Sequence, residues 1–187
     1  MKIPSQAKLV FKGQIFDVYQ WDQEMFDGST ETFEAVKRPN TIQIIPTQGD
    51  KIFISRESQP HRHNYYSLLG GRAEEEEEPL VTAKRELLEE SGLVSDDWEL
   101  FRTYSNFAKL QWDIHFFIAR NCKKVAEPKL DSGEKIEILE YNFDQFKEFV
   151  ENDEHLAKDL ALDLLKMEKM GTLNNFRQKL FGKPSVS

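Results

Sequence analysis

The sequence feature that most constrains this chain is one predicted helix, residues 79–91, that carries three glutamates on one side. Pro79 suits the first turn of a helix, and Gly92 is a common stop signal after the last turn. At about 100° per residue, three carboxylates share an arc of about 100°; they belong to Glu86, Glu89 and Glu90. The adjoining arc is apolar and predicts packing against a core; it consists of Leu80, Ala83 and Leu87.

Carboxylates this close together repel one another, so the helix gives up local stability to carry them. Arg85 lies beside them and offsets part of the repulsion. Carboxylate oxygens on a rigid helix are ligands that Mg²⁺ and Mn²⁺ prefer, so the cluster predicts a divalent-cation site. The other interpretation is a solvated acidic face, which is the usual role of charged runs and applies equally to Glu74–Glu78.

The chain as a whole is acidic, with 25 Lys and Arg against 33 Asp and Glu and a net charge of −8. Such a chain repels polyanions, so we expect no nucleic-acid partner, and phosphate chemistry would need a cation. The start lacks an apolar leader, and no apolar run approaches the ~20 residues of a membrane span. Cys122 is the only cysteine, which fits a reducing compartment. We therefore expect a cytoplasmic protein without membrane contact.

The order of predicted elements is strands, one central helix, more strands and then helices, which indicates a mixed α/β (α+β) fold. Residues 1–40 are expected to form a β-rich element, with a hairpin that turns at Asp27-Gly28. Later strands are expected at 41–46, 52–54, 67–69, 98–104, 113–119 and 136–141. Helices are expected over 143–170, with a break near Asp153. Residues 41–181 would form the main domain, and 182–187 a loose tail.

The spacing around the glutamates decides between a metal site and a solvated face. Residues 71–93 fit the pattern G-x5-E-x7-R-E-U-x-E-E-x-G-U, where U is a bulky aliphatic residue. The matched positions are Gly71, Glu77, Arg85, Glu86, Leu87, Glu89, Glu90, Gly92 and Leu93. This pattern is the box of the Nudix hydrolases, and the chain resembles that superfamily. The layout of its strands is similar to that of the ADP-ribose pyrophosphatases.

The resemblance implies an α/β/α sandwich with a mixed sheet and a small additional N-terminal antiparallel sheet. It also implies hydrolysis of a diphosphate linked to another moiety, with Mg²⁺ or Mn²⁺ as cofactor. Carried over by position, Arg85 would hold the carboxylates in place. The implied metal ligands are Gly71, through its carbonyl, together with Glu77, Glu86, Glu89 and Glu90.

A catalytic base is implied in or before a late strand, where this chain offers Glu134 and Glu137. The other interpretation of these two residues is that both are exposed acids at a strand edge. The arginines near the box are candidates for binding substrate phosphate; they are Arg56, Arg62 and Arg72.

Three segments differ from the ADP-ribose pyrophosphatase pattern, and one of them is residues 105–109, SNFAK, which lack the proline expected a short way beyond the box. The usual E-L-P-A-G is replaced by residues 67–71, SLLGG, and a Q-x-R-P segment by residues 57–60, ESQP. These differences favour a broader nucleoside diphosphate sugar substrate, such as ADP-ribose, cleaved to a nucleoside monophosphate and a sugar phosphate. The alternatives are another Nudix pyrophosphohydrolase, acting on nucleoside triphosphates or RNA 5′ ends, and a non-catalytic ligand sensor. The resemblance also implies a homodimer built through the N-terminal strands.

Overall fold

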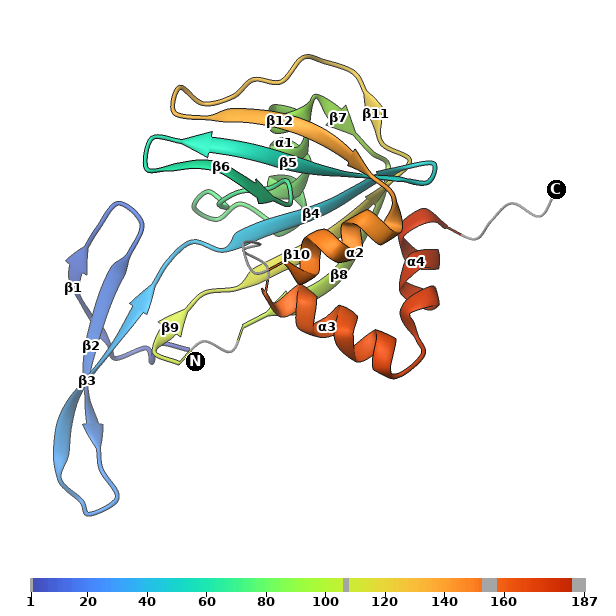
Figure 1. The fold of residues 1–187 in the computed structure, drawn as a ribbon. Helices are drawn as coiled ribbons and strands as arrows, with labels where there is room; N and C mark the ends of the chain where they lie inside the picture. The colour runs from blue at the N-terminus through green and yellow to red at the C-terminus, as the bar shows by residue number, and fades with distance from the viewer. Residues whose placement is uncertain (1, 106–107, 153–157, 183–187) are drawn as a thin grey trace.

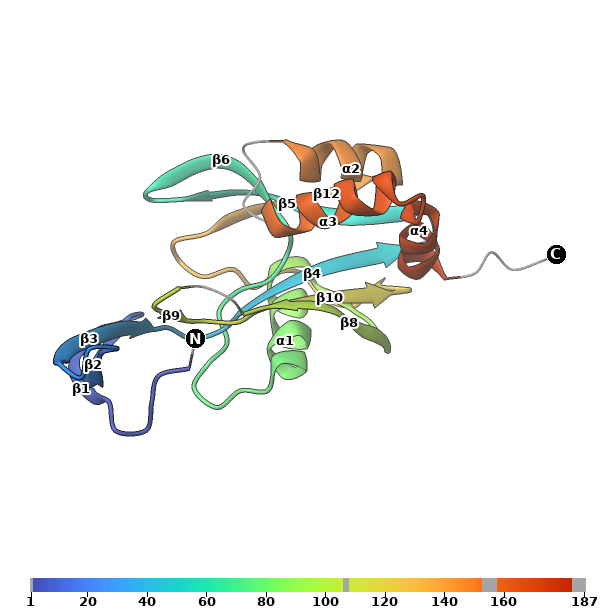
Figure 2. The same ribbon diagram turned by 90° about the horizontal axis from the view of Figure 1, so that it is seen from below.

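A computed structural model of the chain describes residues 2–105, 108–152 and 158–182. Its main body has three layers, with one helix on one face of a mixed sheet and three helices on the other (Figures 1 and 2). The predicted α/β/α sandwich is therefore confirmed. The expected helix break near Asp153 and residues 183–187 of the expected tail lie outside the described residues. No described helix has the length and apolar character that a membrane crossing requires.

The main sheet is mixed, with the strand order β12-β5-β4-β10-β8 and β6 paired to β5. Strands β4 and β10 run parallel, with Ile42 opposite His115, and the other neighbouring pairs are antiparallel. The strands are β4 (Thr41–Gln48), β5 (Lys51–Gln59), β6 (Arg62–Ser67), β8 (Asp97–Tyr104), β10 (Ile114–Arg120) and β12 (Lys135–Tyr141).

Strands β4 and β5 separate soon after their shared hairpin, and this separation makes room for the loop that carries Gly71. The two strands pair only near the turn, through Thr47–Ile52 and Gln48–Lys51. The segment that follows β6 then lies along the open edge of β4, where Gly71 O accepts the Ile42 N–H at 2.8 Å. The strand expected at 67–69 is therefore not an independent strand, because Ser67 ends β6 and residue 69 makes only an isolated bridge to β4.

Helix α1 (Pro79–Ser91) has the predicted boundaries and covers one face of the sheet. Ala83 and Leu87 are fully buried there, as expected. The prediction for Leu80 was wrong, because this side chain is 38% exposed and Thr82 is buried instead. After α1, the two short strands β7 (Leu93–Val94) and β11 (Lys123–Lys124) pair with each other.

The opposite face of the sheet is covered by α2 (Phe143–Glu151), α3 (Lys158–Lys169) and α4 (Leu173–Phe181), of which α4 lies beyond the predicted helical region. Alternation along β5 divides its side chains between the two faces. Ile52 and Ile54 belong to the core under these three helices, whereas Phe53 belongs to the core under α1. The sheet is thus buried on both sides, as its β-branched composition favours.

The N-terminal residues form a second sheet that projects from the main body (Figure 1). Its order is β1 (Lys8–Lys12), β2 (Asp17–Glu24), β3 (Thr30–Lys37) and β9 (Leu110–Gln111). The predicted turn lies between β2 and β3, where Gly28 has a left-handed φ of 82°. The short strand β9 comes from the later part of the chain and pairs in parallel with β3, so the element does not consist of residues 1–40 alone.

Candidate functional site

One cavity of about 740 Å³ brings together the loop before α1, one side of α1, the end of β5 and the loop between β11 and β12. The N-terminal part of the chain also reaches it, through Gln14, Ile15 and the β3–β4 connection. Acidic side chains outnumber basic ones in the lining. The expected ligands Gly71, Glu86, Glu89 and Glu90 are all among the lining residues.

The three glutamates of α1 differ strongly in burial, in the order that their helical angles predict. Glu90, nearest the apolar stripe, is 7% exposed, and the Glu86 side chain is 13% exposed. The Glu89 side chain, on the outer side, is 46% exposed. Burial raises the pKa of Glu90 well above its ordinary value and also raises the pKa of Glu86. The cavity therefore holds carboxylates that are costly to ionise without a nearby positive charge.

Arg85 supplies positive charge to three of the expected carboxylates. Its Nη1 donates to Glu86 Oε1 at 2.9 Å and to Glu89 Oε2 at 3.0 Å. Its Nε and Nη2 donate to the two carboxylate oxygens of Glu77, at 3.1 and 3.0 Å. These bonds lower the pKa of Glu77 to about 2. Glu77 itself does not line the cavity, and it reaches the site through Arg85.

The backbone at Gly71 approaches the Glu86 carboxylate very closely. A Cβ at residue 71 would lie 2.6 Å from Glu86 Oε1, so a larger residue there would displace the Glu86 carboxylate from its present position. Backbone and carboxylate oxygens on two rigid segments are the donor set that Mg²⁺ and Mn²⁺ take, and the residues present fit such a cation. Within the described ranges, no three Asp, Glu, His or Cys side chains already surround one point as a cage. A cation would therefore share these carboxylates with Arg85.

Glu57 is a buried carboxylate of the cavity that sequence reasoning missed. It lies near the end of β5 and is 9% exposed. Its Oε2 accepts the Tyr65 hydroxyl at 2.9 Å, and its Oε1 accepts the Ser55 hydroxyl. Alternation along β5 offered a signal, because Phe53, Ser55 and Glu57 share the face that turns toward α1. A glutamate on a face that is otherwise buried indicates a functional carboxylate.

The structure separates the two candidate bases. Glu134 lines the cavity, and its pKa is raised first by burial and then by Asp131. Glu137 lies opposite Arg56 in the β12–β5 pairing and forms an ion pair with it. Both of these side chains are about half exposed, and neither lines the cavity. Their neighbour Leu139 packs into the core under α2–α4, which places Glu137 on the face away from α1.

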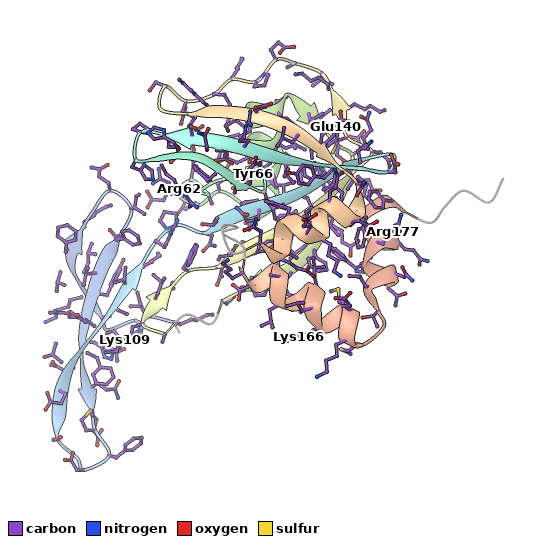
Figure 3. All side chains as sticks on the ribbon, in the orientation of Figure 1. Arg62, Tyr66, Lys109, Glu140, Lys166 and Arg177 are labelled. Carbon is purple, nitrogen blue, oxygen red and sulfur yellow. The ribbon has the colours of Figure 1, made fainter. Side chains whose placement is uncertain are left out.

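The candidate phosphate-binding arginines also divide. Arg72 lines the cavity directly after Gly71, and Arg85 donates to its carbonyl at 3.3 Å. Arg62 lies on the β5–β6 hairpin, stacks 4.5 Å above the Tyr65 ring and does not line the cavity (Figure 3). Arg38, which sequence reasoning did not select, does line it. The structure thus brings together Arg72 and Arg38 but not Arg56 or Arg62.

Known proteins share both the sequence pattern and the architecture of this chain. The NUDIX domain family matches residues 37–163. A protein named ADP-ribose pyrophosphatase from Bacillus subtilis (strain 168) is 28% identical over 151 residues, which cover 78% of this chain and 80% of that protein. A protein named methanol dehydrogenase activator from Bacillus methanolicus is 26% identical over the same shares of both chains. A solved structure titled as an ADP compounds hydrolase is 20% identical and covers 90% of this chain and 95% of its own, with a TM-score of 0.68.

Proposed function

Because this chain belongs to the Nudix family and is a Nudix hydrolase with pyrophosphohydrolase activity, we propose that it cleaves a nucleoside diphosphate sugar such as ADP-ribose. The bond that breaks is the phosphorus–oxygen bond of the pyrophosphate. A water molecule adds its oxygen to one phosphorus, and the products are a nucleoside monophosphate and a sugar phosphate. The relative from Bacillus subtilis, named as an ADP-ribose pyrophosphatase, supports this choice of substrate.

The observation that carries the proposal is the meeting, in one cavity, of buried carboxylates with two arginines, Arg38 and Arg72, that form no ion pair among the described residues. Its volume of about 740 Å³ lies within the range of small-molecule sites and suits a ligand of nucleotide-sugar size. Glu86 and Glu90 offer the carboxylate side, and Arg72 faces the same space from the loop before α1. An anionic diphosphate can approach the two glutamates only if a cation lies between them, whereas it can bind the Arg72 guanidinium directly.

The proposed cofactor is Mg²⁺ or Mn²⁺. When bound, the cation supplies a Lewis acid for the phosphoryl oxygens and lowers the pKa of a water. The residues that would hold it are Gly71, through its carbonyl, and the carboxylates of Glu86, Glu89 and Glu90, with Glu77 acting through Arg85. Arg85 keeps the carboxylates oriented through its hydrogen bonds.

Glu134 is the proposed base that takes the proton of the attacking water. Its carboxylate lies in the cavity, and burial raises its pKa toward the range in which a general base works well. Glu57 orients groups at the same site and is itself held by the Tyr65 and Ser55 hydroxyls. The attack then needs no covalent enzyme intermediate.

The exposed N-terminal strand supports the further proposal of a homodimer. All residues of β1 are exposed, and they include three large apolar side chains; these are Leu9, Val10 and Phe11. An edge strand with such a surface is suited to pairing with a second chain. A reducing, cytoplasmic location belongs to the same proposal, supported by the thiol of Cys122, which is buried and forms no disulfide.

A phosphate-release screen tests the proposal. Purified enzyme with Mg²⁺ or Mn²⁺ is given ADP-ribose, GDP-mannose, UDP-glucose, diadenosine polyphosphates and nucleoside triphosphates, and phosphatase converts the products to phosphate. We expect the nucleoside diphosphate sugars to give the highest kcat/KM. A preference for triphosphates would contradict the proposed substrate class, and no turnover of any compound would favour a ligand sensor.

A further inference from the structure

Arg38 has surroundings that set it apart from the other arginines of the cavity. It follows β3, where the chain passes from the N-terminal sheet into the main sheet. Its Cζ lies 4.5 Å from the ring centre of Trp112 and 5.6 Å from that of Phe16. Two rings at these distances restrict the guanidinium and cover part of its surface. The edge of the group therefore remains the part that can bind a partner.

The partly buried guanidinium of Arg38 has few hydrogen-bond partners among the described residues. Its Nε is buried and has no hydrogen-bond acceptor, and Nη2 has only a long contact of 3.4 Å to Thr41 Oγ1. In the part of the chain that the structure describes, no carboxylate forms an ion pair with it. Arg38 is partly buried, and a buried N–H without an acceptor is unfavourable unless a ligand or water completes its bonding.

A second positive charge, that of Arg72, lies near Arg38 and increases the need for an anion at this place. Burial, and then the nearby charge of Arg72, lower the pKa of Arg38. Two arginines that repel each other thus line one cavity in a chain whose net charge is −8. An anion between them would remove the repulsion and satisfy the free N–H groups. No carboxylate of the described residues takes that place, although acidic residues are abundant.

We propose that Arg38 is a substrate-binding residue that, together with Arg72, holds a phosphoryl group of the diphosphate substrate. This inference rests on the proposed function, because it assumes a phosphorylated substrate in the cavity. Phe16 and Trp112 restrict the guanidinium, so that its terminal Nη–H groups are available to the phosphoryl oxygens. The N-terminal segment then belongs to the substrate site of its own chain, in addition to any role in pairing with another.

Binding measurements without turnover test this assignment. Dissociation constants of adenosine, AMP, ADP and ADP-ribose, the last two as non-hydrolysable methylene analogues, are measured by calorimetry with Mg²⁺ present, so that the carboxylates do not repel the phosphates. The chains compared are the wild type, Arg38→Gln, Arg38→Lys, Arg72→Gln and the control Arg177→Gln. Arg177 is an exposed arginine on α4 whose Cζ lies 5.4 Å from the Phe143 ring centre, so its replacement removes a ring-stacked guanidinium far from the cavity (Figure 3).

We expect Arg38→Gln to raise the dissociation constants of ADP and ADP-ribose by about 10- to 100-fold and to leave that of adenosine unchanged. Only the phosphates lose a charge-assisted hydrogen bond in this variant. Arg72→Gln should show the same selectivity. Arg38→Lys should be intermediate, because it keeps the charge but not the planar fork. Arg177→Gln should match the wild type. With ADP-ribose as substrate, Arg38→Gln should raise KM more than it lowers kcat.

Three results would overturn the inference. The first is equal weakening of adenosine and ADP in Arg38→Gln, which would indicate a structural clamp between Phe16 and Trp112. The second is an Arg38→Gln chain that binds ADP as tightly as Arg177→Gln does. The third is a wild type that binds ADP no better than adenosine. If Arg38→Gln does not fold, the dissociation constants of Arg38→Lys and Arg72→Gln for ADP and adenosine test the inference in its place. Failure of the substrate screen, by contrast, would contradict the proposed function itself.

Discussion

The N–H of Gly70 donates to Glu90 Oε2 at 2.7 Å, which ties the loop before α1 to the last turn of the helix. The bond explains how a carboxylate that is only 7% exposed keeps a partner inside the protein. It also fixes the loop at the point where Gly71 passes Glu86. The proposed metal site therefore depends on a contact between two segments twenty residues apart.

Glu90→Gln should separate catalysis from folding. Glutamine keeps an oxygen for the Gly70 N–H but removes the charge that a cation needs, so kcat should fall by at least about 100-fold. The matched control is Glu78→Gln, because Glu78 is exposed and its side chain makes no cap hydrogen bond at the start of α1. Steady-state kinetics and thermal melts of both variants check this. Equal losses of kcat in the two would contradict the assigned ligands.

Glu77→Gln should change the dependence of stability on pH. Arg85 lowers the pKa of Glu77 to about 2 in the folded chain, from an ordinary value of 4.5. A carboxyl whose folded pKa is lowered contributes stability above about pH 4.5, and this contribution is lost as the pH falls toward 2. The Tm of the wild type should therefore exceed that of the variant most above pH 4.5. A difference in Tm that is constant down to pH 2 would contradict the pairing.

Glu134→Gln and Glu137→Gln should give opposite results. Glu134 lines the cavity, so loss of this base should lower kcat by about 10²- to 10⁴-fold and remove the acidic limb of the pH profile. Glu137 pairs with Arg56 outside the cavity, so its replacement should leave kcat unchanged. Initial rates across pH 5–9 distinguish the two. A larger loss in Glu137→Gln would show that β12 presents its other face to the substrate.

Removal of divalent cations should abolish turnover. The carboxylates of the cavity repel a diphosphate unless a cation lies between them, so we expect no hydrolysis in excess EDTA. Activity should return with Mg²⁺ or Mn²⁺ and rise toward alkaline pH, because a bound water must lose a proton. Full turnover of ADP-ribose in EDTA would contradict the cofactor proposal.

Phe11→Glu should dissociate the proposed homodimer. Phe11 is 60% exposed in β1, and a charge there would oppose pairing of two such strands. Light scattering of the wild type should give twice the chain mass of 21.9 kDa, and the variant should give the chain mass itself. A wild type that scatters as a monomer at micromolar concentration would contradict the dimer.

Local sequence determined the helix and its box. Pro79, Gly92 and the 3.6-residue period are signals within one helix, so the boundaries of α1 could be predicted from them alone. The Asp27-Gly28 turn was equally predictable, because a tight hairpin depends on a residue that tolerates positive φ. The identities and spacing of the box then identified the family, which the match over residues 37–163 confirms.

Tertiary structure decided which other residues belong to the cavity. Alternation divides the side chains of β5 and β12 between two faces, but it does not say which face meets α1. That choice depends on strand pairing and on what packs over each face. As a result, Glu57 lines the cavity, whereas Glu137 and Arg56 lie on the other face of the sheet. Arg38 enters for a similar reason, because only the folded chain brings Phe16 and Trp112 close to its guanidinium.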